Sequence, residues 1–545
     1  MLGQITNPII RGFNPDPSII RVDDDYYIAT STFEWFPGVQ IHHSKDLVNW
    51  TLLTHPLSRK SQLNLIGVPD SCGVWAPCLS YRDGTFYLVY SNVKSFNGVW
   101  KDTPNYLVTA KDILGPWSEP IYLNSSGFDA SLFHDDDGRS YLLNMLIDHR
   151  RGRLFGGIVM QEFDLEKSQL VGTVHYLASG TEHGCAEGPH LYKRNNYYYL
   201  MLAEGGTGYD HCVTLMRSKS IIGPYETHPE NPIITAKDSP DSELQKAGHA
   251  DLISTSEDEW YLVFLTGRPL SQLGRCTLGR ETSIAPVYWG DDDWLYHTSE
   301  TRAPQMTISA PHAARNVEQN NNQSKEISFS DKRPLDINLQ SLREPISDEW
   351  VSVNARPGHL RIIGRESLSS TFHQSILGHR LQAHHASVST CVEFTPKSYQ
   401  QMAGLVCYYN TRHYHYLHIR GDSELNDSNH KFLTITSCDN GEIIEPIDGG
   451  IDVSLAEKIW LKAEFKFETI QFYYSLIKPV CEADWLRIGA PLDGSILSDD
   501  YVAHEETGFE PCFTGVFFAI CCQDLSGQRN HADFAWFNYH EISSL

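Results

Sequence analysis

The chain has 545 residues, enough for two to four average domains or two large ones. It carries 43 Lys and Arg residues against 68 Asp and Glu residues, a formal net charge of −25. A protein that neutralises phosphates needs the opposite charge bias, so no nucleic-acid partner is expected. No apolar run approaches the roughly 20 residues that span a bilayer, so no membrane partner is expected either.

The cysteines and the N-terminus indicate the compartment. Twelve cysteines are scattered along the chain without a CxxC pair, and the first residues lack the basic-then-apolar layout of a signal peptide. In a chain of this size such thiols are expected to be free, as in a reducing compartment. We therefore expect a cytoplasmic protein.

Five repeats of short strands and turns occupy the first 300 residues. Each repeat contains an aromatic strand, and the aligned tyrosines are Tyr27, Tyr87, Tyr141, Tyr199 and Tyr261. Successive tyrosines are 60, 54, 58 and 62 positions apart. Repeats of about 40 to 60 residues built from short strands are typical of propellers and solenoids. Five units of four strands predict a five-bladed β-propeller.

One position of the repeat changes its chemistry in every unit. It lies 11 or 12 positions before the tyrosine and is occupied in turn by Asp16, Trp75, Asp129, Glu187 and His249. A packing position would stay apolar. Because the first strand of every blade lines the central channel of a propeller, these five side chains are expected to converge. The sequence therefore predicts a site at the channel mouth.

Three carboxyl groups beside an aromatic ring fit the hydrolysis of a glycosidic bond. That reaction uses one carboxylic acid to protonate the leaving oxygen and one carboxylate on the anomeric side. A third carboxylate raises the pKa of the acid by like-charge repulsion. Trp75 is a candidate platform for a sugar ring, and His249 would contact the sugar or hold water or a divalent cation. Ca²⁺ is compatible with the channel near His249, but the sequence requires no cofactor and assigns no metal ligand.

The pattern weakens after Trp294, and the polar stretch 316–325 is predicted to be a linker. Longer strands follow, for example residues 388–394, 460–467 and 513–520, and they are typical of a β-sandwich. We therefore predict an all-β chain. A five-bladed propeller would occupy residues 1–310, and a lectin-like jelly-roll sandwich would occupy residues 326–545.

Four motifs resemble those of the family 43 glycoside hydrolases. They are residues 13–18 (FNPDPS), 127–131 (GFDAS), 186–190 (AEGPH) and 278–282 (LGRET). The chain is similar to the two-domain β-xylosidases of that family over almost its full length. The resemblance implies an inverting hydrolase on a five-bladed propeller, and similar enzymes are often homo-oligomers.

The resemblance also implies roles for single residues. Asp16 would be the general base that activates water, and Glu187 would be the general acid. Asp129 would tune the pKa of the acid and help to orient it. Arg280 would bind the terminal sugar and the carboxylates, and Phe33 would lie near that sugar.

Two departures and one loop bear on substrate detail. Ala130 stands where the family often has Pro, and Ala250 stands where a Gly often follows the His. In similar enzymes a loop of the C-terminal domain reaches the site with an aromatic residue, and Phe509 or Phe513 is the candidate here. None of these positions is one of the three catalytic carboxyl groups.

The hypothesis is an inverting exo-β-xylosidase that releases xylose from the non-reducing end of short xylo-oligosaccharides. An α-L-arabinofuranosidase or a bifunctional enzyme is the alternative, because the two sugars present similar groups. A fructan- or sucrose-type propeller hydrolase and a non-catalytic carbohydrate-binding propeller are more remote. Inversion needs room for a water molecule, so the Asp16 and Glu187 carboxyls are expected about 6.5–9.5 Å apart.

Overall fold

The computed structural model describes residues 2–96, 98, 100–150, 153–271, 274–321, 323–329, 335–422, 430–503 and 512–542. The chain divides into two compact units. The first comprises Met1–Leu63, Ser71–Pro269 and Arg280–Asn320, and the second comprises Asn64–Asp70, Leu270–Gly279 and Asn321–Leu545. Two short segments that interrupt the sequence of the first unit thus belong to the second unit.

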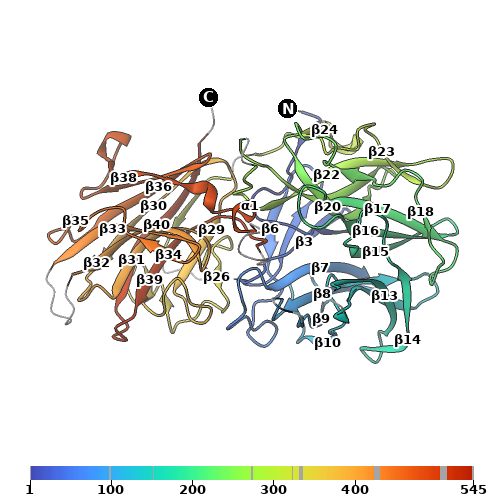
Figure 1. Cartoon of the computed structure of the whole chain (residues 1–545), viewed down its shortest axis with the longest axis horizontal. Helices are drawn as coiled ribbons and strands as arrows, with labels where there is room; N and C mark the ends of the chain where they lie inside the picture. Colours follow the sequence, from blue (N-terminus) through green and yellow to red (C-terminus); the bar gives the residue numbers. More distant parts are fainter. Residues whose placement is uncertain are drawn as a thin grey trace. The chain divides into compact units, whose positions relative to one another are not determined.

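The first unit is a five-bladed β-propeller, which confirms the predicted fold (Figure 1). Its blades are antiparallel sheets whose strands follow one another in sequence. Blade 1 contains β2 (Ser18–Val22), β3 (Asp25–Thr30), β5 (Gln40–Ser44) and β6 (Thr51–Thr54), and blade 2 contains β7 (Gly73–Arg82), β8 (Thr85–Val93), β9 (Asn105–Ala110) and β10 (Ile121–Asn124). Blade 3 contains β11 (Ser131–His134), β12 (Ser140–Ile147), β13 (Phe155–Asp164) and β14 (Gln169–Ala178), and blade 4 contains β15 (Glu187–Arg194), β16 (Tyr197–Glu204), β17 (Cys212–Ser218), β18 (Glu226–Thr227) and β19 (Ile234–Thr235). Blade 5 contains β20 (Gln245–Ser254), β21 (Trp260–Gly267), β22 (Arg280–Trp289) and β23 (Leu295–His297).

In every blade the turn between the first two strands is formed by a residue that tolerates a left-handed backbone conformation. A residue in the left-handed region of backbone space stands there in every blade, namely Asp23, Asp83 with Gly84, Gly138, Asn195 and Asp258. Gly, Asn and Asp tolerate this conformation better than other residues do. The aromatic second strand then packs between blades, so buried clusters join blade 5 to blade 1, blade 4 to blade 5, and blade 2 to blade 3.

The N-terminal segment closes the ring of blades. Strand β1 (Gln4–Thr6) pairs with β24 (Thr307–Ser309), which follows the fifth blade. The Asn14 backbone N–H donates to the Arg280 carbonyl at 2.9 Å. The Thr282 hydroxyl donates to the Asn14 carbonyl at 2.7 Å. The first and the last blade are therefore joined immediately beside Asp16.

The second unit is a β-sandwich, as predicted (Figure 1). One sheet contains β25 (Lys325–Ser328), β27 (Val351–Ser352), β28 (Leu360–Ile363), β30 (His385–Phe394), β36 (Ile459–Lys466), β37 (Thr469–Ser475), β38 (Leu486–Asp493) and β40 (His531–Glu541). The other contains β29 (Ile376–Arg380), β31 (Gln401–Asn410), β32 (His413–Gly421), β33 (Lys431–Asp439), β34 (Glu442–Ile444), β35 (Ile451–Asp452) and β39 (Phe517–Asp524). Side chains from both sheets form one buried core. Strand β39 is buried along its whole length and begins at Phe517, four residues later than the strand expected over 513–520.

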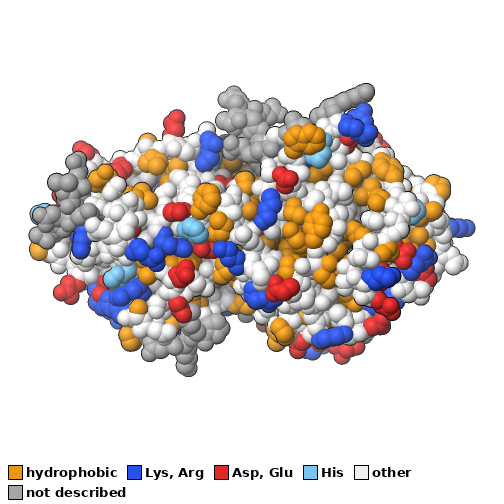
Figure 2. All heavy atoms as spheres, turned by 90° about the horizontal axis from the view of Figure 1, so that it is seen from below, with side chains coloured by type: hydrophobic (Ala, Val, Ile, Leu, Met, Phe, Trp, Pro, Cys, Tyr) orange, Lys and Arg blue, Asp and Glu red, His pale blue; other side chains and the backbone are white. Residues whose placement is uncertain are grey.

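The surface carries charges of both signs. Acidic and basic side chains are interspersed among hydrophobic ones over the face drawn in Figure 2. Within the described ranges, no helix has the length and apolar character needed to cross a membrane. The twelve cysteines are all free thiols.

Candidate active site

The structure places the five variable residues at equivalent positions, either within the innermost strand of each blade or two residues before it. Asp16, Asp129 and His249 adopt left-handed backbone conformations, with φ of 53°, 54° and 48°. In the other two blades the following residue does so, and a β-bulge re-aims the strand after Trp75 and after Glu187. Strain at equivalent positions of five blades is typical of a functional site, where the backbone is bent to aim side chains.

Asp16 is the best-connected carboxyl of this group. Its Oδ2 accepts a 2.6 Å hydrogen bond from the Ser31 hydroxyl. Its Oδ1 lies 3.5 Å from Nη1 of Arg280 and 3.5 Å from Nδ1 of His249. The Ser31 oxygen also accepts the Ala76 backbone N–H at 2.8 Å, which joins blade 2 to the same group. Three blades therefore fix the Asp16 carboxylate.

Asp129 and His249 meet at Gly188. The Gly188 N–H donates to Asp129 Oδ2 at 3.2 Å. A Cβ atom at Gly188 would lie 3.0 Å from His249 Nε2, and the glycine itself has a φ of +56°. Only glycine suits this position without strain, because a side chain would oppose both the backbone conformation and the imidazole.

Two of the three buried carboxyl groups, Asp129 and Glu187, have raised pKa values. Asp16, Asp129 and Glu187 are only 6–8% exposed. Burial, the charge of Asp129 and then the charge of Asp16 raise the pKa of Glu187 well above its ordinary value, against the opposing effect of Arg280. Burial and Asp16 likewise raise the pKa of Asp129, so Asp129 and Glu187 titrate as a pair that keeps a proton near neutral pH. A protonated carboxylic acid is the group that a glycosidic leaving oxygen needs.

His249 contributes a neutral imidazole rather than a charge. Burial lowers its pKa to about 4, although the neighbouring Asp16 carboxylate opposes this shift. Near neutral pH the positive charge beside Asp16 is therefore that of Arg280, which is 3% exposed. This pairing offsets part of the cost of burying the Asp16 carboxylate.

Aromatic rings enclose one side of the carboxyl group cluster. The Trp75 ring lies 4.9 Å from Phe96, 5.2 Å from Phe128 and 6.0 Å from Phe33. Its indole N–H donates to the Ser71 carbonyl at 2.9 Å, which fixes the ring orientation. Phe33 has a φ of 50°, and its ring lies 6.0 Å from the Arg280 guanidinium. The two predicted aromatic residues thus form one wall with Arg280 beside it.

A second polar ring follows the first along the channel. Two or three residues beyond the variable position stand Ser18, Cys78, Ser131, His190 and Asp251. The Asp251 carboxylate accepts hydrogen bonds from Ser18 Oγ at 3.0 Å, Ile19 N at 2.8 Å and Tyr192 OH at 2.6 Å. It also lies 3.7 Å from His190 Nδ1. This ring ties blades 1, 4 and 5 together below the catalytic candidates.

The comparisons with known proteins decide the family. The family model described as "Glycosyl hydrolases family 43" matches residues 5–295, and "Beta xylosidase C-terminal Concanavalin A-like domain" matches residues 326–540. The chain belongs to glycosyl hydrolase family 43. It is 48% identical to "Beta-xylosidase" of Bacillus subtilis (strain 168) over 99% of this chain and 100% of the relative.

Two further members of family 43 share almost the whole length. "Xylosidase/arabinosidase 43B" of Humicola insolens is 47% identical over 99% of this chain and 98% of that protein. The crystal structure of "xylan beta-1,4-xylosidase from Bacillus Halodurans C-125" superposes with a TM-score of 0.93 at 47% identity, over 98% of this chain and 100% of that one. The resemblance inferred from four motifs is thereby confirmed, and the protein is a glycoside hydrolase.

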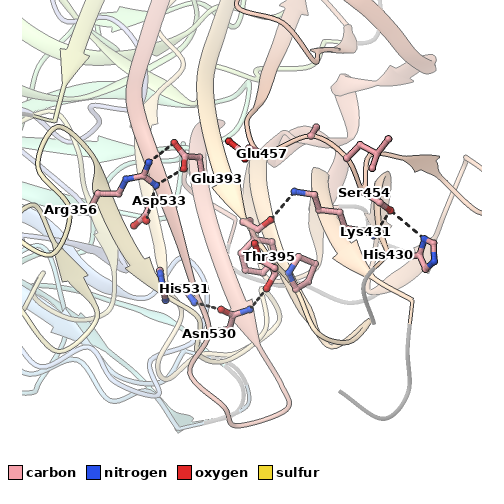
Figure 3. Close-up of a pocket in the computed structure, with 14 residues that line it drawn as sticks. Arg356, Glu393, Thr395, His430, Lys431, Ser454, Glu457, Asn530, His531 and Asp533 are labelled. Carbon is pink, nitrogen blue, oxygen red and sulfur yellow. Dashed lines mark hydrogen bonds and ion pairs between the residues drawn. The ribbon is translucent and has the colours of Figure 1, made fainter. Parts of the chain in front are cut away.

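The sandwich of this family 43 member contains a separate hollow of about 510 Å³ (Figure 3). Arg356 contacts both Glu393 and Asp533 there, with ion-pair distances of 2.5 and 3.2 Å. Burial alone would raise the pKa values of these two carboxyls, but hydrogen bonds from Arg356 and Arg361 lower them. Both stay ionised, whereas cleavage of a glycosidic bond needs a protonated acid, so the propeller cluster is the better candidate for the chemistry.

Sequence reasoning missed several members of the site. Ser31 and Gly188 contact the carboxyl groups directly, and Asp251 holds the strand that follows Asp16. The polar run 30–32 at the end of an apolar strand is the signal that points to Ser31. Phe509 lies outside the described residues, so its predicted place in the site stays a prediction.

The predicted Ca²⁺ position near His249 also stays a prediction. In the part of the chain that the structure describes, one group of three His, Cys, Asp or Glu side chains is spaced to share a metal ion. It consists of Cys276, Asp499 and Asp500, all in the second unit. His249 would instead contribute a single neutral nitrogen beside Asp16, which suits a water molecule as well as a cation.

Proposed function

We propose that this family 43 hydrolase is an inverting exo-β-xylosidase acting on short β-1,4-xylo-oligosaccharides. The observation that carries the proposal is the buried carboxyl group cluster in which Glu187 has a raised pKa while Asp16 is paired with Arg280. One protonated acid and one ionised base are the two partners that inversion requires. The substrate class is supported by relatives named as β-xylosidases that match over their full length.

The reaction follows from these two groups. Asp16 would remove a proton from a water molecule as that water attacks the anomeric carbon from the face opposite the leaving group. Glu187 would give its proton to the glycosidic oxygen as the carbon–oxygen bond breaks. The products are a shortened chain and xylose of inverted anomeric configuration. Asp129 would help to keep the proton on Glu187, because repulsion between like charges disfavours ionising both buried carboxyls.

The enclosure of the site favours action at a chain end. The three carboxyl groups are almost fully buried, and the wall of Phe33 and Trp75 stands beside them. A terminal sugar can reach carboxyls that are buried on most sides, whereas an internal unit of a long chain would need an opening on both sides. Arg280 is suited to hydrogen bonding with the hydroxyl groups of that terminal sugar.

Proton NMR of xylobiose hydrolysis during the first turnovers tests the stereochemistry. Release of α-xylose is expected, and initial release of β-xylose would contradict the assignment of Asp16 as a base. Arabinofuranosidase activity is the second candidate, because one similar protein bears both activities in its name. Parallel assays with 4-nitrophenyl β-xyloside and α-L-arabinofuranoside rank the two, and cleavage of the arabinoside alone would overturn the substrate choice.

The Glu187→Gln variant tests the general acid. It should lose about 10²- to 10⁴-fold in kcat on xylobiose, the range typical of general acid catalysis. The loss should be much smaller on an aryl xyloside with a highly acidic phenol as its leaving group, because that phenol leaves without protonation. Equal losses on both substrates would remove Glu187 from the acid role. A cytoplasmic location is part of the proposal, since short oligomers can be imported, and cell fractionation checks it.

A further inference from the structure

One tryptophan of this propeller is left open to solvent. Trp100 is 72% exposed, and among the described tryptophans it alone belongs to the exposed large hydrophobic residues. Aromatic rings of this size usually gain free energy by burial. A ligand that covered the Trp100 ring would recover this free energy.

Trp100 lies at the same end of the propeller as the carboxyl groups. Strand β8 runs towards this end, because its last residue Val93 pairs with Gly73, just before Trp75. The segment between β8 and β9 carries Trp100. In the next blade β12 also ends here, where the Ile147 N–H donates to the Ser126 carbonyl three residues before Asp129.

A chain of contacts leads from the aromatic wall to Trp100. Phe96 packs on Trp75, and the Lys101 ammonium stands 4.7 Å above the Phe96 ring. The Lys101 backbone N–H donates to His149 Nε2 at 3.3 Å. The His149 ring lies 4.9 Å from the Trp100 ring at an angle of 49°. Trp100 is thus connected to the aromatic wall through His149, Lys101 and Phe96.

The exposed ring borders a hollow with sugar-binding chemistry. The hollow measures about 460 Å³ and is lined by Trp100, Leu146, Ile147, Asp148, His149, Arg150 and Gly156. Arg150 forms two hydrogen bonds to the Asp148 carboxylate, at 2.8 and 3.1 Å. An aromatic face together with a few fixed polar groups is the usual composition of a small-molecule site. Xylose offers the matching surface, an apolar ring face edged by hydroxyl groups.

We propose that Trp100, with His149 and the Asp148–Arg150 pair, forms a subsite for a distal xylose unit of the leaving chain. The occupant follows from continuity with the active site, since a chain whose terminal unit lies at the carboxyl groups leaves the propeller at the end where Trp100 stands. The inference rests on the proposed function and adds a determinant of chain-length preference to it. Trp100 touches no reacting atom, so it acts on binding of the longer substrate.

Substrates of different length isolate the effect of Trp100→Ala. The variant should lower kcat/KM on xylotetraose about 5- to 30-fold, the range expected for loss of one buried aromatic contact. On 4-nitrophenyl β-xyloside, which has no distal sugar, the change should stay below twofold. Trp100→Phe should recover much of the loss. Tyr288→Ala is the matched control, because Tyr288 is 51% exposed and lies near the far end of β22 from Arg280.

Equal losses on both substrates, or no loss on xylotetraose, would overturn the subsite. A binding measurement separates this failure from failure of the proposed function. In a Glu187→Gln background, calorimetry should show weaker xylotetraose binding after Trp100→Ala and unchanged xylose binding. If the wild-type protein cleaves neither 4-nitrophenyl β-xyloside nor xylotetraose, the proposed function itself is wrong. If it cleaves both while Trp100→Ala binds xylotetraose normally, only the subsite is wrong.

Discussion

Replacement of Ser31 by Ala is the sharpest test of how this site is assembled. The Ser31 hydroxyl donates to Asp16 Oδ2 at 2.6 Å, and its oxygen accepts the Ala76 N–H at 2.8 Å. The variant removes both contacts and adds no atoms. Asp16 would keep Arg280 and His249 as neighbours but would lose the donor that fixes one of its oxygens.

The expected loss follows from the two hydrogen bonds. A bond to a charged group contributes about 1.5–3 kcal/mol. If that energy serves to orient the base in the transition state, kcat/KM should fall about 10- to 150-fold. The buried Ala76 N–H would also lose an acceptor, so the free energy of unfolding should drop by about 1–3 kcal/mol.

Turnover of 4-nitrophenyl β-xyloside well below the melting temperature, together with urea unfolding, separates the two effects. Ser44→Ala is the matched control. The Ser44 hydroxyl donates to Asp46 at 3.0 Å and accepts the Leu47 N–H at 3.0 Å, at the opposite end of the same blade. It should lose stability and keep its turnover. A Ser31→Ala protein with turnover within twofold of wild type would refute the reasoning, as would an equal loss in Ser44→Ala.

Three other perturbations probe the remaining contacts. Asp129→Asn removes a carboxyl whose charge helps to raise the pKa of Glu187, so the alkaline limb of the kcat/KM profile should move to lower pH; an unmoved limb would leave burial and Asp16 as the causes. Gly188→Ala should lower both Tm and kcat, because Gly188 has a φ of +56° and an added Cβ would contact His249. Gly84→Ala should lower Tm alone, because Gly84 has a φ of +72° but open space around it. Equal kcat values in the two variants would show that the His249 contact is not the cause. Treatment with EDTA should leave activity unchanged, and a loss restored by Ca²⁺ would show that the channel needs a cation.

The fold and the central ring could be predicted because the repeat made them visible. Equivalent positions of a propeller converge, so Asp16, Asp129 and Glu187 could be grouped although up to 171 positions separate them. Turn residues and aromatic strands recur in every unit and set the blade boundaries. The longer strands expected after residue 325 likewise predicted a sandwich, since long apolar strands such as β39 are typical of packed sheets.

The remaining contacts of the site depend on strand register and long-range packing, which the sequence pattern does not specify. The Gly188 N–H reaches Asp129 only because a bulge follows Glu187, and a bulge depends on strand register rather than on residue type. Ser31 contacts Asp16 because β2 and β3 pair in one particular register. The segments 64–70 and 270–279 belong to the second unit through contacts made far from them in sequence.

The activity of this enzyme depends on the contact between its first and last blades, because the proposed catalytic base stands at that contact. The seam between blade 5 and blade 1 is held by the β1–β24 pair, by a buried apolar cluster and by hydrogen bonds such as that from the Asn14 N–H to the Arg280 carbonyl. Asp16 follows Asn14 by two residues, and the Arg280 side chain is the cation that lies beside the Asp16 carboxylate. A slight parting of the seam on warming would separate the base from its counter-charge while every sheet survived. Catalysis would then fade before the circular dichroism of the strands reported any unfolding.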